Sequence, residues 1–196
     1  MFGAEPSYAA RKAAEVFKDE GRVSILELGS GQGRDTIFFA RNGLNVRATD
    51  YSEPGLEAIR RRSRALGLSE SITTLLHDVR EPLPFSDESF DACFAHMLFC
   101  MALTTTELEH LSAEVRRVLK PGGLCVYTVR TTDDPDYGRG AHVGEGMYKV
   151  REFIIHFFSQ QQVEHLASGY DIVSIERFEE HTLPRRLFLV TLRRRG

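Results

Sequence analysis

A glycine-rich turn carries the clearest chemical signal in this sequence. It reads Glu27-Leu28-Gly29-Ser30-Gly31-Gln32-Gly33, with a glycine at every second position from Gly29. Glycine lets a backbone turn sharply and approach a ligand closely, and the first N–H groups of a following helix attract negative charge. The pattern therefore predicts a ligand-binding loop. A tight turn without a ligand is the alternative that these glycines alone leave open.

Asp50 is the next candidate, because it ends the following apolar stretch, 21 residues after Gly29. A carboxylate at that place can accept hydrogen bonds from both hydroxyls of a ribose. An aspartate there can also do no more than open a turn before Ser52. Together with the glycine loop, Asp50 favours a ligand that contains adenosine.

The spacing of the glycines argues against a dinucleotide. The nicotinamide-type fingerprint needs a third glycine where this sequence has Arg34, because a pyrophosphate and a close helix contact must fit there. Glu27, just before the loop, suits an ammonium group and would repel a pyrophosphate. These residues predict a ligand with a zwitterionic amino-acid end.

Apolar strand-like stretches alternate with helical patterns from Val23 onward, which is typical of a parallel sheet flanked by helices. We expect an α/β, doubly wound, mostly parallel seven-stranded sheet with helices on both faces and a C-terminal antiparallel hairpin. The expected strands are residues 23–28, 44–49, 72–76, 90–97, 124–129, 170–178 and 187–192. The length fits one domain, residues 1–196, with a helical lead-in at residues 1–22.

Helix boundaries are marked by capping residues. Ser52 with Pro54 opens one expected helix, and Asn42-Gly43 ends the one before it. The run Ser159-Gln160-Gln161-Gln162 has the form of a capping box. Residues 130–156 lack clear periodicity and are unusually long for a connection, so we expect a substrate-covering loop there.

Five segments resemble the successive motifs of class I, Rossmann-like methyltransferases that use S-adenosylmethionine. They are Ile25 to Thr36, Thr49 to Ser52, His77 to Arg80, Phe90 to Ala92 and Leu119 to Gly123, and they occur in the family's order. The resemblance spans residues 24–129. It implies S-adenosyl-L-methionine as cofactor and a sheet order of 3-2-1-4-5-7-6 with the last strand of the chain antiparallel to its neighbours.

The resemblance also assigns roles to individual residues. Asp78 would bind the adenine amino group, the Val79 backbone a ring nitrogen, and Tyr51 the adenine face. Asp78 as a turn residue and Tyr51 as a packed aromatic are the alternatives. The full expected cofactor set is Glu27, Gly29, Ser30, Gly31, Gln32, Gly33, Arg34, Asp50, Tyr51, Ser52, Asp78, Val79, Ala95 and His96.

The methyl acceptor is expected near residues 95–99, at the carboxyl end of the fourth strand. This segment lacks the Asn-Pro-Pro-Tyr pattern of enzymes that act on nucleobase or glutamine amino groups. His96 could accept a proton, although a histidine between apolar residues is more often a core residue. The expected catalytic residues are His96 and Tyr137, and the expected substrate contacts are Phe99, Arg139, His142 and Tyr148.

A weaker similarity links the Gly31 to Asp35 run and the Asp136 to Gly140 stretch to methyltransferases of the tellurite-resistance and thiopurine type. Such acceptors are small molecules with soft nucleophiles, which need no strong base. The predicted function is therefore methyl transfer from S-adenosylmethionine to a small molecule by direct in-line displacement. An NAD(P)-dependent oxidoreductase and a non-catalytic S-adenosylmethionine-binding domain are the alternatives.

Composition narrows the partners. A net charge of −3 and a pI near 6.2 give no global attraction to nucleic acid. No stretch is apolar and long enough for a signal peptide or a membrane span, so we expect a cytoplasmic monomer or homodimer. The three cysteines show no metal-binding spacing, and we expect reduced, buried thiols and no metal. The arginines at positions 60, 61, 62 and 64 are expected to form a solvated face.

Overall fold

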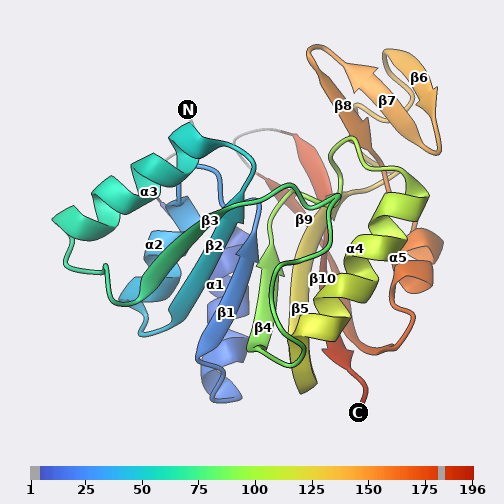
Figure 1. The fold of residues 1–196 in the computed structure, drawn as a ribbon. Coiled ribbons are helices and arrows are strands. Elements are labelled where there is room, and N and C mark those ends of the chain that lie inside the picture. Colours follow the sequence, from blue (N-terminus) through green and yellow to red (C-terminus); the bar gives the residue numbers. More distant parts are fainter. Residues whose placement is uncertain (1–4, 181–183) are drawn as a thin grey trace.

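The computed structural model describes residues 5–180 and 184–196. Its centre is a seven-stranded sheet with the order β3-β2-β1-β4-β5-β10-β9 (Figure 1). Neighbouring strands run parallel from β3 to β5, and β10 is antiparallel to both β5 and β9. The predicted fold class and strand order are confirmed. The strands are β1 (Ser24–Leu28), β2 (Asn45–Asp50), β3 (Ile72–Leu76), β4 (Phe90–Ala95), β5 (Leu119–Arg130), β9 (Tyr170–Glu180) and β10 (Arg185–Arg194).

Helices cover both faces of this sheet. One apolar layer contains side chains from α1, α2 and α3, and the other contains side chains from α4 and α5. Successive strand residues point to opposite faces, so Phe94 packs in the first layer and Cys93 in the second. The helices are α1 (Tyr8–Asp19), α2 (Arg34–Arg41), α3 (Glu53–Ala65), α4 (Thr105–Val118) and α5 (Gln160–Leu166).

The capping residues lie where the sequence places them. Ser52 caps α3 by accepting the N–H of Gly55, and Ser159 forms the expected capping box with Gln162. Gly43 has a φ of +82° just after α2, which is a left-handed stop that glycine adopts without strain. The predicted lead-in helix is α1, although the first four residues of that range lie outside the described part of the chain.

The prediction that residues 130–156 are irregular is wrong. They contain a second antiparallel sheet of β6 (Ala141–Gly144), β7 (Met147–Val150) and β8 (Phe153–His156), which projects beyond the carboxyl end of β5 in Figure 1. Glu145 and Gly146 both have positive φ, as a tight hairpin turn requires. Strands of four residues that lie largely exposed show little alternation of apolar and polar residues in the sequence, so the segment reads as a loop.

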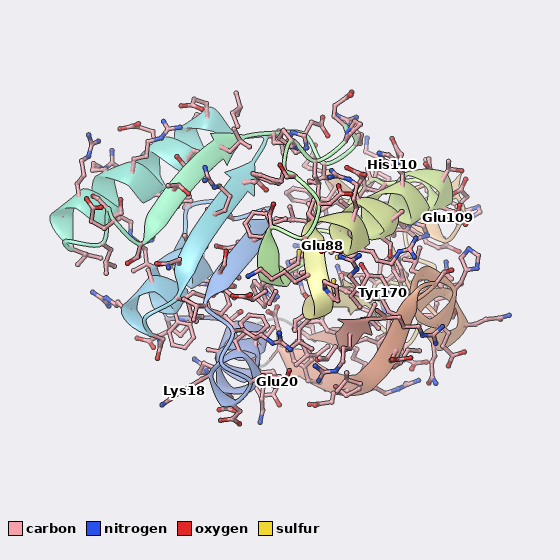
Figure 2. The ribbon with its side chains drawn as sticks, turned by 60° about the horizontal axis from the view of Figure 1, so that its bottom comes forward. Lys18, Glu20, Glu88, Glu109, His110 and Tyr170 are labelled. Carbon is pink, nitrogen blue, oxygen red and sulfur yellow. The ribbon has the colours of Figure 1, made fainter. Side chains whose placement is uncertain are left out.

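The amino ends of the strands form the opposite end of the molecule. Glu20, labelled at that end in Figure 2, follows α1 and accepts hydrogen bonds from Arg193 on β10 and from Arg22. These guanidinium contacts lower the pKa of Glu20 to about 2. The first helix is therefore tied to the last strand.

All three cysteines are buried and unpaired, as expected. Among residues 5–180 and 184–196, no helix has the length and apolar character needed to cross a membrane.

Candidate methyl-donor site

The glycine loop is built against the end of β2. The N–H of Ser30 donates to the Thr49 carbonyl, and the N–H of Gly31 donates to Asp50 Oδ2 at 2.7 Å. Gly29, Gly31 and Gly33 all have φ between +55° and +78°, where a side chain is strained. The loop and Asp50 are therefore joined by a direct hydrogen bond.

Gly31 and Gly33 lack side chains for different structural reasons. A Cβ at Gly33 would lie 2.5 Å from Ile59 Cγ1 on α3, so packing between α2 and α3 excludes a side chain there. A Cβ at Gly31 would meet no protein atom within 4 Å. Gly31 thus keeps a space open that the fold itself does not fill.

Glu27 is the buried carboxyl group of the site. Glu27 lies near the end of β1 and is 3% exposed. Its Oε2 has no hydrogen-bond partner in the described part of the chain. Burial raises the pKa of this carboxyl to about 8. A buried acceptor without a donor is costly, so the site is suited to a ligand that brings an N–H or an ammonium group.

Asp50 keeps acceptor capacity beyond its protein contacts. Each carboxylate oxygen accepts one backbone N–H, Oδ2 from Gly31 and Oδ1 from Ser52 at 2.8 Å. An ionised carboxylate has about four lone-pair sites, so the hydroxyls of a ribose can share it. Of the neighbouring predictions, Tyr51 is 76% exposed beside Asp50, and the Ser52 hydroxyl serves as the α3 cap.

Asp78 follows β3 at the same edge of the sheet, since the adjacent His77 N–H donates to the Asp50 carbonyl. Its carboxylate binds the Arg80 side chain and accepts the Arg80 N–H. These bonds lower the pKa of Asp78 to about 2. An adenine amino group would have to share this carboxylate with Arg80. Val79 is partly buried against the core.

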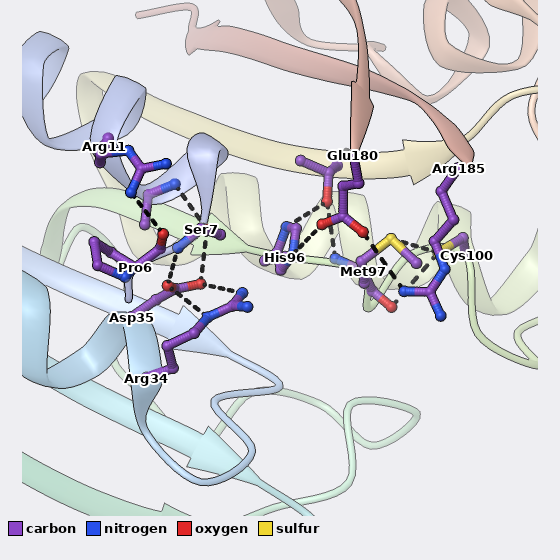
Figure 3. Close-up of polar contacts among 12 residues, drawn as sticks. Pro6, Ser7, Arg11, Arg34, Asp35, His96, Met97, Cys100, Glu180 and Arg185 are labelled. Carbon is purple, nitrogen blue, oxygen red and sulfur yellow. Dashed lines mark hydrogen bonds and ion pairs between the residues drawn. The ribbon is translucent and has the colours of Figure 1, made fainter. Parts of the chain in front are cut away.

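Arg34, in the position of the absent third glycine, forms two bonds of 3.1 Å with Asp35. Asp35 in turn accepts the N–H and the hydroxyl of Ser7, the residue that caps α1 (Figure 3). The start of α1 is therefore attached to the helix that follows the glycine loop.

His96 lies just after β4, at the same edge of the sheet. Its Nδ1 is 2.9 Å from the Thr128 hydroxyl on β5. Its Nε2 is 3.7 Å from Glu180 Oε1 on β9, and Figure 3 shows this pair. The side chain is 13% exposed, and burial lowers the pKa of the imidazole. His96 is thus a buried histidine whose two ring nitrogens face polar partners.

Comparison with known proteins decides the family. A sequence model of the family described as "Methyltransferase domain" matches residues 25–123, half of the chain. The chain belongs to this family. The match contains the glycine loop, Asp50, Asp78 and His96.

Curated relatives of this family member are longer proteins. "Sterol methyltransferase-like 2" of Botryococcus braunii is 32% identical over 121 residues, which are 61% of this chain and 30% of that protein. The "Demethylmenaquinone methyltransferase" of Clavibacter sepedonicus is 36% identical over 102 residues, 52% of this chain and 39% of that protein. The chain therefore spans about a third of the length of these relatives.

Solved structures show the same fold. The structure of a SAM-dependent methyltransferase from Methanosarcina mazei has a TM-score of 0.77 at 21% identity, and the match covers 88% of this chain and 92% of that chain. TehB from Haemophilus influenzae has a TM-score of 0.72 at 14% identity and covers 94% of this chain and 62% of its own. These likenesses confirm the methyltransferase fold.

Two residues predicted to contact ligands are core residues in this methyltransferase-family chain. Phe99 was expected to touch the acceptor, but it is 1% exposed and stacks on Tyr127 with ring centroids 4.6 Å apart. Ala95 is fully buried at the end of β4. An apolar side chain at a strand end packs inward when the sheet continues beside it, which periodicity alone does not show.

The remaining predicted acceptor residues lie on or before the small sheet. Tyr137 and Tyr148 form an aromatic cluster with Phe157, and the ring of His142 packs against Tyr148 at 4.9 Å. Arg139 is exposed. The residues that sequence reasoning missed are Asp35, Thr128, Glu180 and Arg185. Asp35 ends the Gly31 to Asp35 run, but that run gave no role for it. Thr128 lies far in the sequence from Glu180 and Arg185, and these residues meet only through the strand order, so no local pattern marks them.

Proposed function

We propose that this chain transfers a methyl group from S-adenosylmethionine to a small molecule. Family membership supports the reaction class, and the orphaned Glu27 oxygen beside an open glycine loop is the observation that carries the donor. Glu27 would bind the ammonium of the donor, with residues 29–33 around its methionine part. Asp50 would bind the ribose hydroxyls. The donor supplies a sulfonium methyl group that is already activated for attack.

The other predicted cofactor contacts belong to the same proposal. Asp78, Val79 and Tyr51 would surround the adenine. Ser30, Gln32 and Arg34 would contribute through the loop, together with Ser52 and the strand-end residues Ala95 and His96. Gly33 would border the donor with the rest of the loop, and its lack of a side chain also leaves room for Ile59.

The acceptor is proposed to be a small molecule that binds between His96 and the small sheet. The relatives are named for sterols and demethylmenaquinone, and one structural neighbour carries bound 1,6-didemethyltoxoflavin and S-adenosylhomocysteine. Residues 130–156 would cover this acceptor. His96 and Tyr137 would act in catalysis, and Arg139, His142 and Tyr148 would contact the acceptor.

The proposed setting is a cytoplasmic monomer or homodimer that binds no nucleic acid and no metal. The oxidoreductase alternative loses support because Arg34 and Glu27 both disfavour a pyrophosphate, and because the chain belongs to a methyltransferase-domain family. A donor-binding domain without catalysis would keep the same loop, so only turnover separates it from an enzyme.

Gly31→Ala tests the donor site against a matched control. Gly21 follows α1 at the opposite end of the sheet, and it shares both a positive φ (+65°) and open space for a Cβ. Both variants should therefore be strained by about 1 kcal/mol. Only Gly31→Ala should also lose donor affinity, by about tenfold or more, because only there does the methyl group enter the proposed ligand space.

Thermal shift with S-adenosylmethionine, S-adenosylhomocysteine, NADH and NADPH is the measurement, because a ligand that binds the folded state raises the melting temperature. The two adenosyl ligands should stabilise the wild type and Gly21→Ala. Stabilisation by NADH or NADPH alone, or equal donor binding in both variants, would overturn the donor assignment. Transfer of a labelled methyl group to a metabolite panel then separates enzyme from sensor.

A further inference from the structure

The strand ends beside the glycine loop bring His96 between two polar side chains that are distant in the sequence. Thr128 lies 32 residues away and approaches Nδ1 at 2.9 Å. Glu180 lies on the C-terminal hairpin, and its Oε1 is 3.7 Å from Nε2. Figure 3 shows His96 beneath Glu180, on the side of the molecule that also holds Arg34 and Asp35.

The backbone after His96 is strained in a way that fixes the ring. Met97 has a φ of +60°, an uncommon value for a residue with a side chain, and its N–H donates to Thr128 Oγ1 at 2.9 Å. Such strain persists where surrounding contacts determine the conformation, and it clusters at functional sites. Thr128 therefore positions both the backbone and the imidazole.

The Thr128 hydroxyl also bears on the tautomer of His96. Its oxygen has two lone pairs, of which one accepts the Met97 N–H. The second can accept a hydrogen bond from the Nδ1–H group of His96. With the proton on Nδ1, the lone pair of Nε2 faces Glu180. The distance from Nε2 to Glu180 Oε1 is 3.7 Å, which is too long for a direct hydrogen bond. Nε2 is then available to a third group.

Four charged groups act on His96. Glu180 and Asp35 favour the protonated imidazole, whereas Arg34 and Arg185 oppose it. Burial, the largest effect, lowers the pKa of His96 and keeps the ring neutral near pH 7. Arg185 lies 3.6 Å from the second oxygen of Glu180, so the carboxylate is held at the end of the hairpin. A neutral imidazole beside a fixed carboxylate can take up a proton.

We infer that His96 accepts a proton from the methyl acceptor, and that the acceptor therefore attacks through an O–H or N–H group. Glu180 is a positioning residue, which stabilises the imidazolium that forms. This inference rests on the proposed function. The acceptor atom forms a bond to the methyl carbon as the carbon–sulfur bond breaks, and the bonding pair stays on sulfur. The proton of the acceptor passes to Nε2. Thr128, on the other side of the ring, holds Nδ1.

This inference differs from the expectation of a soft nucleophile, which stays a prediction. A thiolate or a metalloid needs little help from a base, and the sequence showed no catalytic dyad. The pair is visible only in the fold, because Glu180 approaches β4 from across β5 and β10 in the sheet order.

Histidine NMR tests the pair without any methyl acceptor. Long-range proton–nitrogen spectra of uniformly ¹⁵N-labelled protein, titrated from acid to alkaline pH, report the tautomer and pKa of His96, with His96→Asn identifying its signals. Glu180→Gln should weaken proton binding by His96 at least roughly threefold. Glu179→Gln is the matched control, because Glu179 is exposed on the same strand. An unchanged His96 pKa in Glu180→Gln, or a proton fixed on Nε2, would overturn the inference.

Turnover supplies the second readout, with matched phenols, aromatic amines and aromatic thiols as acceptors. The inference predicts that the wild type methylates a phenol or an amine. Glu180→Gln and Thr128→Val should lower kcat roughly tenfold or more with donor affinity unchanged, and the acid limb of the rate profile should follow the His96 pKa. Methylation of thiols alone, at equal rates in Glu180→Gln, contradicts the proton-accepting pair but keeps the methyltransferase. Absence of donor binding contradicts the proposed function. The NMR result still shows whether Glu180 acts on His96 as inferred.

Discussion

Glu27 shows how one buried side chain can link ligand binding to pH. The carboxyl has a pKa of about 8 in the folded chain against 4.5 as its ordinary value. A raised carboxyl pKa favours folding below the ordinary value, and that contribution is lost as pH rises from about 4.5 to about 8. A donor ammonium reverses this preference by pairing with the ionised carboxylate. Donor binding near neutral pH should therefore release a proton.

The prediction is that affinity for S-adenosylmethionine rises between pH 6 and 7.5, where Glu27 of the free protein is mostly protonated. Calorimetry in buffers of different ionisation enthalpy should show release of up to one proton at pH 7. Glu27→Gln is the control, since it keeps the shape of the side chain without the titration. A pH dependence that persists unchanged in Glu27→Gln would assign the effect to another group.

At the residue scale the sequence marks the proposed donor site more clearly than the proposed acceptor site. The glycines, Glu27 and Asp50 lie in short, ordered motifs, and local spacing alone brings them to one edge of a parallel sheet. His96 was predicted as an isolated candidate, but its partners Thr128 and Glu180 come from other strands. The burial of Phe99 against Tyr127 could not be predicted, because it depends on the neighbouring strand, and its contact with the acceptor stays a prediction.

The contact between α2 and α3 shows how elements shape the glycine loop. Gly33 is the residue before α2, and a methyl group there would overlap Ile59 at 2.5 Å while also straining a φ of +78°. Gly33→Ala should lower the free energy of unfolding by about 2 kcal/mol, from backbone strain and overpacking together. Urea denaturation of Gly33→Ala, Ile59→Ala and the double variant measures this change in the free energy of unfolding.

The double variant separates the two causes. Ile59→Ala removes the atom that the new methyl group meets, so the two substitutions together should cost less than their sum by about 1 kcal/mol. Simple additivity would show that backbone strain at Gly33 acts alone.

Elements with a clear burial pattern or a capping residue could be predicted, whereas the three strands of the small sheet could not. The seven strands of the main sheet and the capped helices carry burial patterns or capping residues that determine them. The small sheet escaped prediction because its four-residue strands pair mainly with one another and leave many side chains exposed. Its anchors are long-range: Glu145 accepts the Thr105 N–H, and the His156 N–H donates to the Cys100 carbonyl.

The whole molecule is tied together at the end opposite the proposed site. The Glu20 carboxylate, 28% exposed, binds Arg193 at 2.7 Å and joins α1 to β10. Its pKa of about 2 lies below the ordinary 4.5, so its contribution to stability is present above about pH 4.5 and is lost as pH falls toward 2.

Glu20→Gln should lower the free energy of unfolding by about 1 kcal/mol at pH 7, because solvent screens this partly exposed pair. The difference from the wild type should shrink as pH falls from 4.5 toward 2. Chemical denaturation across that range is the measurement, and Glu15→Gln on the exposed face of α1 is the control. A difference that stays constant with pH would show that packing, not charge, connects the two elements.

The bond network from Ser7 through Asp35 to Arg34 makes the start of α1 a reporter of the donor site. Anything that restrains the helix after the glycine loop also restrains the cap of α1, and linkage makes this influence reciprocal. Amide protons near Ser7 should therefore exchange more slowly with solvent when donor is bound, although they contact no donor atom. By the same reciprocity, a substitution at Ser7 should change the affinity for the donor without touching the donor itself.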